Sequence, residues 1–346
     1  MAKAADERLS RIDALFRDFD RPDAPGATVM VIRDAKVLFA KSYGLADVEK
    51  KIPATPDTNY RLASVTKQFT AMVIMQLADR AKLSLDDPIT KFFPEFPGYG
   101  NKITVRHLVN HTSGLWDYEE LIPKGTPIPV LDIDALRLVM QRDKTYFPPG
   151  TQFRYSNTGF ALLALIVEKV SGETFAAYLR EHIFAPLHMN QTLAYEAGIS
   201  IVPNRAFGYT QTAEGFKRTD QSLTSSVLGD GGVYSSIADL RKWDEALYST
   251  KLVSRKMLKA AFTAGPNTKH GDGTVQYGFG WFISEYRGLR NIWHSGESIG
   301  FTTRIERFPD RKFTVIILTN RNDAKISDIP HRIADWYLFG NETSRK

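Results

Sequence analysis

The stretch YRLASVTKQFTA, residues 60–71, says more about the fold and chemistry of this chain than any other. Apolar residues up to position 77 predict a helix over 63–78, which places Ser64 and Lys67 three positions apart on one face. A serine hydroxyl needs a neighbouring base to act as a nucleophile, and a desolvated lysine is one such base. Backbone N–H groups at a helix start also suit a developing oxyanion. The alternative is that Ser64 caps the helix and Lys67 is solvated.

A second segment, FPPGTQFRYSNTG at residues 147–159, is followed by an apolar run from 160 to 170. Pro and Gly mark a loop, and the run predicts a helix. Tyr155 and Asn157 would then lie where the loop meets the helix, with the tyrosine relaying protons and the asparagine binding a substrate carbonyl. The alternative is that Asn157 caps the helix and Tyr155 packs at the loop base.

A third segment, WHSGESIGF at residues 293–301, lies between two apolar runs that are typical of strands. Ser-x-x-Lys, Tyr-x-Asn and a polar residue-x-Gly, in this order, form the pattern of serine β-lactamases and penicillin-binding proteins. The chain resembles that superfamily, particularly its class C-like branch. The resemblance covers about residues 27–322 and includes HTSGL at 111–115, PLHM at 186–189, GDGGVYSS at 229–236 and YGFGW at 277–281.

The resemblance implies an α/β (α+β) fold of the β-lactamase/transpeptidase type, with an antiparallel sheet flanked by terminal helices and an inserted, mainly helical lobe. The periodicity predicts strands at 26–33, 36–43, 277–285, 290–295, 300–308 and 312–319, and helices at 5–19, 63–78, 132–142, 157–171, 173–184, 236–248, 254–262 and 325–338. We therefore expect residues 1–62 together with 276–346 to form an α/β lobe and residues 63–275 a helical lobe. One catalytic site would lie in the cleft between them.

The resemblance also implies a mechanism. Ser64 would attack a carbonyl carbon, its proton would pass to Lys67 or Tyr155, and an acyl-enzyme would form. Backbone N–H groups of Ser64 and Glu297 would hold the oxyanion, and Gly296 would allow their close approach. Tyr155 or Lys67 would then activate the water that releases the acid.

Asn157 would position both the lysine and the acyl group, and no cofactor or metal is expected. On the strand, His294-Ser295-Gly296 stands where β-lactamases and penicillin-binding proteins usually carry a lysine that gives a positive charge for a substrate carboxylate. Histidine is mostly neutral at pH 7, so weak β-lactamase activity at most is expected. The alternative for His294 is a strand residue satisfied by the backbone.

The His-x-Gly variant is similar to that of D-aminopeptidase-type hydrolases and family VIII esterases. It favours a carboxylesterase or D-amino-acid-type peptidase or amidase acting on a small ester, amide or short peptide. A class C-like β-lactamase or DD-peptidase is an alternative. A non-turnover penicillin-binding sensor or structural protein is an alternative of another class.

Two other patterns compete with this interpretation. GESIG at 296–300 fits the nucleophile elbow of α/β-hydrolases, with Ser298 as nucleophile, but the elbow needs a following helix and residues 301–309 alternate like a strand. His107 and His111 have the i, i+4 spacing of zinc ligands. They lack the intervening glutamate and a third ligand nearby, so we expect them to pack and cap a helix end.

Composition excludes other classes of function. The 45 basic and 39 acidic residues are scattered without a basic run, so nucleic-acid binding is not expected. There is no cysteine, which excludes disulfides, thiol nucleophiles and Cys-ligated zinc. No apolar run reaches the roughly 20 residues of a membrane span. The start of the chain also lacks a signal core, so we expect a soluble cytoplasmic protein, or a periplasmic or secreted one if a signal peptide was removed.

Overall fold

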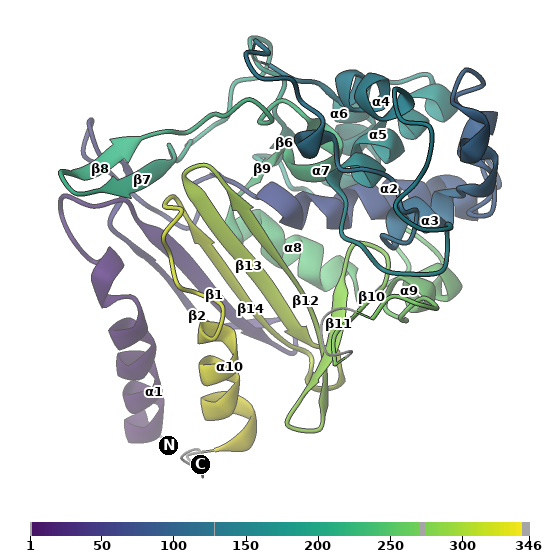
Figure 1. Ribbon diagram of the computed structural model, residues 1–346. Helices are drawn as coiled ribbons and strands as arrows, with labels where there is room; N and C mark the ends of the chain where they lie inside the picture. Colours follow the sequence, from purple (N-terminus) through teal and green to yellow (C-terminus); the bar gives the residue numbers. More distant parts are fainter. Residues whose placement is uncertain (1, 128, 270–273, 341–346) are drawn as a thin grey trace.

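An antiparallel sheet built from both ends of the chain forms the centre of the structure (Figure 1). The computed structural model describes residues 2–127, 129–269 and 274–340, and within them this sheet has seven strands in the order β10-β11-β12-β13-β14-β1-β2. In that order the strands span Gln276–Tyr277, Phe282–Tyr286, Leu289–Ser298, Phe301–Phe308, Phe313–Thr319, Ala27–Arg33 and Lys36–Tyr43. The predicted α/β fold with an antiparallel sheet is confirmed.

The central strands are buried on both faces of the sheet. Successive side chains along a strand pack into two different apolar clusters. Along β1, Val29 and Val31 belong to one apolar cluster, whereas Met30 and Ile32 belong to the other. Period-two alternation sends neighbouring side chains to opposite faces of a sheet. Apolar residues on both faces therefore require a cover on both sides.

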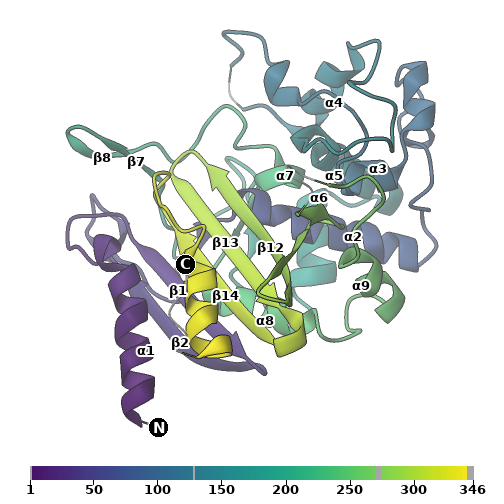
Figure 2. The ribbon, with the colours of Figure 1, turned by 60° about the horizontal axis from the view of Figure 1, so that its bottom comes forward.

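Terminal helices cover the first face of the sheet. α1 (Ala2–Leu15) and α10 (Ile329–Ala334) lie side by side over it, as Figures 1 and 2 show, and share one apolar cluster with the sheet. α8 (Ile237–Ala246) packs against the second face through β1 and β14. Within the described ranges, no helix is both long and apolar enough to cross a membrane.

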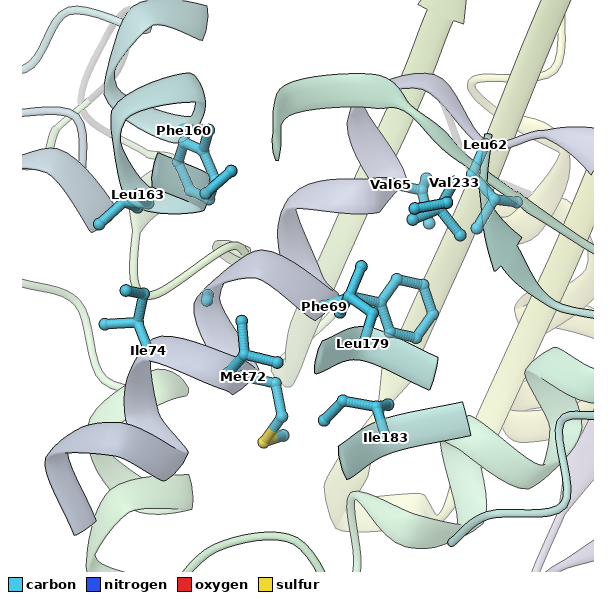
Figure 3. Close-up of a cluster of buried hydrophobic side chains, with 14 of the residues drawn as sticks. Leu62, Val65, Phe69, Met72, Ile74, Phe160, Leu163, Leu179, Ile183 and Val233 are labelled. Atoms are coloured by element: carbon cyan, nitrogen blue, oxygen red, sulfur yellow. The ribbon is translucent and has the colours of Figure 1, made fainter. Parts of the chain in front are cut away.

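α2 (Lys67–Asp79) runs through the helical part of the molecule and is buried on all sides from its first residue to Leu77. A helix that is enclosed on all sides belongs to a core. Figure 3 shows Phe69 of this helix gathered with Leu179 and Ile183 in one apolar cluster. Ser64 thus lies in the 3₁₀ turn directly before this enclosed helix.

Further helices and strands surround this core. They are β3 (Leu45–Asp47), β4 (Ile52–Pro53), β5 (Tyr60–Arg61), η2 (Ala63–Thr66), α3 (Val105–Val109), α4 (Asp132–Met140), α5 (Asn157–Ser171), α6 (Phe175–Leu179), β6 (Leu193–Ala194), β7 (Tyr209–Thr212), β8 (Gly215–Arg218), α7 (Leu228–Gly231), β9 (Val233–Ser235) and α9 (Arg255–Ala261). Three helices, α1, α6 and α10, are followed by short 3₁₀ or π turns.

Two expected elements differ from the structure. The helix expected over 63–78 begins as the 3₁₀ turn η2, with Ala63 at a φ of 47°, and becomes α-helical only at Lys67. The single strand expected over 277–285 is split into β10 and β11. Between them Gly280 has a φ of 76° and packs against the backbone of α2, so the chain turns there.

A buried ion pair joins α8 to the sheet. Arg307 of β13 donates from Nε to Oδ1 of Asp244 at 2.7 Å, and Thr314 of β14 donates to the same oxygen at 2.8 Å. Arg307 is only 1% exposed. The Asp244 carboxylate therefore supplies the counter-charge that this buried guanidinium needs.

Asp244→Ala is expected to lower the free energy of unfolding by about 3–5 kcal/mol, because it leaves the Arg307 guanidinium buried without its counter-charge. Glu181→Ala, which removes an exposed pair with Arg180, is the control and should change stability by less than about 1 kcal/mol. Urea unfolding would measure both variants. Equal losses of unfolding free energy in the two variants would contradict a stabilising role for the buried pair of Asp244 and Arg307.

Candidate active site

The amine of Lys67 organises the site. Lys67 is fully buried, and its Nζ donates to Oγ of Ser64 at 3.0 Å, to Oδ1 of Asn157 at 2.8 Å and to the backbone oxygen of Asp230 at 2.8 Å. An ammonium has three N–H donors, and these three uncharged oxygens match them. The structure rules out the alternative of a solvated lysine.

Asn157 is held in place by two carboxyls. It starts α5, and Ser156 before it makes no side-chain capping bond. Instead, the Asp117 carboxylate accepts the backbone N–H of Asn157 at 2.6 Å. The Asn157 amide also donates to Oε1 of Glu119 at 3.3 Å. Asn157 therefore does not cap its own helix, and its side chain connects Lys67 to Glu119.

Tyr155 lies over the lysine and against a buried histidine. Its ring centroid is 5.0 Å from Nζ of Lys67 and 4.2 Å from the ring of His111. His111 accepts the backbone N–H of Ser156 at Nδ1, 3.2 Å away. Burial, reinforced by the charge of Lys67, lowers the pKa of His111 well below its usual value. A neutral His111 thus supports the loop that carries Tyr155.

The second histidine of the possible zinc pair is used differently. His107 forms a capping box with Thr104 at the start of α3. The packing and capping roles expected for His107 and His111 are confirmed. Across the part of the chain that the structure describes, no group of three His, Asp or Glu residues is placed to hold a metal ion.

β12 brings residues 294–297 past Ser64. A Cβ added to Gly296 would lie 2.1 Å from the backbone oxygen of Leu62 and 3.1 Å from the backbone nitrogen of Ser64. Real Cβ contacts are not that short, so a side chain here would push the strand away. Glycine is required for this approach to the Ser64 N–H.

His294 is enclosed by protein. Its Nδ1 lies 2.6 Å from the backbone oxygen of Ser295, and its Nε2 lies 2.9 Å from the Tyr277 hydroxyl. A carbonyl oxygen only accepts, so Nδ1 carries the proton and Nε2 accepts from Tyr277. Burial, and next the charge of Lys67, lowers the pKa of His294 to about 3. The imidazole is therefore neutral at physiological pH, and both its nitrogens are occupied.

A small pocket of about 60 Å³ opens beside Ser64. Its lining residues are Arg61, Ala63, Ser64, Tyr118, Glu119, Asn157, Thr224, Asp230, Gly231, Glu297 and Ser298. Burial, and next repulsion by Asp117, raises the pKa of Glu119 to about 7. Burial raises the pKa of Asp230 to about 7 against the opposing charge of Lys67. The Tyr118 hydroxyl donates to Oδ2 of Asp230 at 2.9 Å.

The structure thus brings Ser64, Lys67 and Asn157 into direct contact, with Tyr155 and residues 294–297 around them. Ser298, the competing nucleophile, ends β12 and is followed by β13. No helix follows it, so the nucleophile elbow is absent.

Sequence reasoning missed Arg61, Glu119 and Asp230 as members of the pocket. Arg61 stands three residues before Ser64, and Asp230 lies inside the GDGGVYSS segment, so both were within the motifs already considered. No sequence pattern identifies Glu119 as a pocket residue, because its contact with Asn157 exists only once the chain has folded.

Comparison with known proteins gives a consistent result. The Beta-lactamase family model matches residues 12–335. Penicillin-binding protein 4* of Bacillus subtilis (strain 168) is 32% identical over 350 residues, covering 96% of this chain and 76% of the relative. Several curated relatives are longer than this chain, which spans 64% to 81% of their length.

Two solved structures are similar over nearly the whole chain. The penicillin-binding protein from Bacillus halodurans has 28% identity and a TM-score of 0.82, over 93% of this chain and 98% of that one. The D-amino acid amidase from Ochrobactrum anthropi SV3, in complex with L-phenylalanine, has 25% identity and a TM-score of 0.80, over 100% of both chains.

Gly296→Ala is expected to slow the reaction of Ser64 with a fluorophosphonate by roughly 100-fold or more, since the added methyl moves β12 away from the Ser64 N–H. Gly98→Ala is the matched control, because nothing lies within 4 Å of the added carbon. Stopped-flow labelling would give both rates. Wild-type labelling by Gly296→Ala would contradict the close approach.

A pH-dependent stability is expected from Asp230. Its raised pKa means that between about pH 4 and 7 the native state binds its proton more tightly than the unfolded chain does. This stabilisation is present at low pH and is lost as the pH rises towards the native pKa. Asp230→Asn keeps an acceptor for Tyr118 and removes the titration.

The stability of the wild type relative to Asp230→Asn should therefore fall by roughly 2–4 kcal/mol from pH 4.5 to 7.5. Denaturant titrations at a series of pH values would measure this difference. A difference that stays constant over the range would show that Asp230 is not protonated in the native state near neutrality.

Proposed function

The chain belongs to the beta-lactamase family, and from this premise we propose that it is a serine hydrolase acting through an acyl-Ser64 intermediate. Its relatives and structural neighbours include penicillin-binding proteins and an amidase. The observation that carries the proposal is the 3.0 Å contact between Nζ of Lys67 and Oγ of Ser64 in a buried site.

The proposed mechanism follows from that contact. When the Lys67 amine is unprotonated, the hydrogen bond reverses and the Ser64 hydroxyl donates to Nζ. Ser64 Oγ then attacks the carbonyl carbon of an ester or amide while Lys67 takes its proton. Tyr155, over the lysine, relays this proton to the leaving group as its bond to the carbonyl carbon breaks.

The N–H groups of Ser64 and Glu297 are proposed to hold the oxyanion, where Gly296 permits the approach of the strand. Asn157 positions Lys67 and the acyl group. Water activated by Tyr155 or Lys67 attacks the acyl-enzyme, and the acid leaves with regeneration of the Ser64 hydroxyl.

The proposed substrates are small esters, amides or short peptides. The neutral His294, with both nitrogens engaged, supplies no positive charge for a substrate carboxylate at its strand position. This favours a carboxylesterase or a D-amino-acid-type peptidase or amidase with weak β-lactamase activity at most. The likeness to a D-amino acid amidase supports the amide branch of this proposal.

A second candidate is a penicillin-reactive enzyme, a class C-like β-lactamase or DD-peptidase. The 32% identity to Penicillin-binding protein 4* favours it. Fast deacylation of a penicillin adduct would indicate a β-lactamase. A long-lived adduct without turnover of any ester or amide would instead indicate a sensor.

We also propose the division into lobes expected from the sequence, with residues 1–62 and 276–346 in one and 63–275 in the other. β12 comes from the first, while η2, α5 and α7 come from the second. The site would then lie where these elements meet, so that both lobes contribute to one pocket.

Ser64→Ala is expected to abolish acylation and to lower turnover by roughly 10⁴-fold or more, because no other group replaces the nucleophile. The measurement is burst kinetics with intact-mass spectrometry, using p-nitrophenyl acetate and butyrate, a D-alanyl p-nitroanilide and nitrocefin. The exposed Ser84→Ala should keep the burst and the adduct. Turnover that survives in Ser64→Ala and is lost in Ser298→Ala would overturn the assignment.

A further inference from the structure

Arg61 is a buried cation without a counter-charge in contact with it. Among the described residues three arginines are buried: Arg61 is 3% exposed, Arg304 is 8% exposed and Arg307 is 1% exposed. Arg304 contacts the carboxylate of Glu306 at 2.6 Å, and Arg307 contacts that of Asp244 at 2.7 Å. No described residue pairs with Arg61 in this way, and its Nε and Nη1 are buried without an acceptor.

Arg61 lines the same small pocket as the nucleophile. Ser298 lines it too, and the Ser298 hydroxyl is likewise buried without a partner. Buried donors that find no acceptor cost free energy, so such groups are normally matched by protein, water or ligand. The wall of the pocket beside Ser64 therefore contains hydrogen-bond donors for which the described residues supply no acceptor. A guanidinium is suited to a carboxylate, because its planar fork can donate two parallel bonds.

Carboxyls in the same wall would oppose an anion if all were ionised. Glu119 and Asp230 have pKa values raised to about 7, so near neutral pH both are partly protonated and then donate hydrogen bonds. The side chain of Glu297 is exposed to solvent, which screens its charge. Lys67 adds a positive charge next to the pocket.

The position of the pocket indicates which part of a substrate enters it. His294 and Ser295 do not line it, whereas Glu297 and Ser298 at the other end of the motif do. Asn157, the residue proposed to position the acyl group, also borders it. A volume of about 60 Å³ is small, which suits a compact polar group such as a carboxylate.

Resting on the proposed function, we propose that this pocket binds a carboxylate at the end of a short acyl group, with Arg61 as its anchor and Ser298 as a second donor. The substrate class is then a half-ester or half-amide of a short dicarboxylic acid. Arg61 is a binding residue in this proposal and takes no part in bond breaking.

The test compares methyl hydrogen succinate with methyl butyrate, an uncharged ester of similar size, by pH-stat titration in the wild type, Arg61→Gln and Arg61→Lys. The readout is the ratio of the two kcat/KM values, which does not change if part of a variant is unfolded. Arg61→Gln should lower this ratio by roughly 10- to 100-fold, as loss of a charge-assisted hydrogen bond does. Arg61→Lys should restore part of it.

A second pair of substrates, O-acetylglycolate and ethyl acetate, places the carboxylate on the leaving group. Here Arg61→Gln should leave the ratio unchanged. A preference for O-acetylglycolate that depends on Arg61 would overturn the assignment to the acyl side.

Calorimetric titration of succinate into Ser64→Ala tests the pocket without turnover, and Arg61→Gln in that background should weaken binding at least tenfold. If uncharged esters acylate Ser64 while neither the succinate ratio nor succinate binding depends on Arg61, this inference fails and the proposed function stands. If no substrate acylates Ser64, the proposed function fails, and succinate binding alone decides the role of Arg61.

Discussion

The burial of one amine is the constraint on which the rest of the site depends. Removing an ammonium from water costs several kcal/mol or more unless its hydrogen bonds are replaced. Lys67 recovers them from the side chains of Ser64 and Asn157 and from the backbone of Asp230. Those oxygens come from three segments distant in the sequence, so the amine is satisfied only when η2, α5 and α7 are correctly assembled. The same contacts that stabilise the fold also place the Ser64 hydroxyl beside the Lys67 amine.

Packing behind the amine keeps these segments in register. Thr70 of α2 donates to the backbone oxygen of Gly229 at 2.6 Å, which fixes the neighbouring carbonyl of Asp230. Thr66 accepts the N–H of Val233 at 3.1 Å on the other side of α7. The start of α5 is tied in turn to Asp117. A rigid, buried support of this kind is what a catalytic contact of about 3 Å requires.

Local geometry explains what the sequence predicted and what it did not. The contact between Ser64 and Lys67 follows from an i, i+3 spacing, and the buried strands β1 and β14 follow from near-continuous runs of apolar residues. The split of the strand expected over 277–285 depends on Gly280 meeting the backbone of α2, which no local pattern contains. The raised pKa values of Glu119 and Asp230 likewise arise from burial and crowding created by the fold. Residues recognised by motif were thus found in advance, while residues that act through distant neighbours were not.

The positive charge beside the pocket does not come from the strand motif His294-Ser295-Gly296. At position 294 the imidazole is neutral and enclosed, because burial and the nearby amine both disfavour its charged form. The cation that lines the pocket is instead Arg61, and His294 does not line it. Coulomb interactions are stronger in a poorly hydrated pocket. A cation at position 61 in place of one at position 294 therefore changes where on a substrate a carboxylate is bound. Two enzymes with the same nucleophile and base can differ in substrate for this reason. On the proposal made for Arg61, the position of the unpaired guanidinium, more than the pair Ser64 and Lys67, decides which acyl group this chain binds.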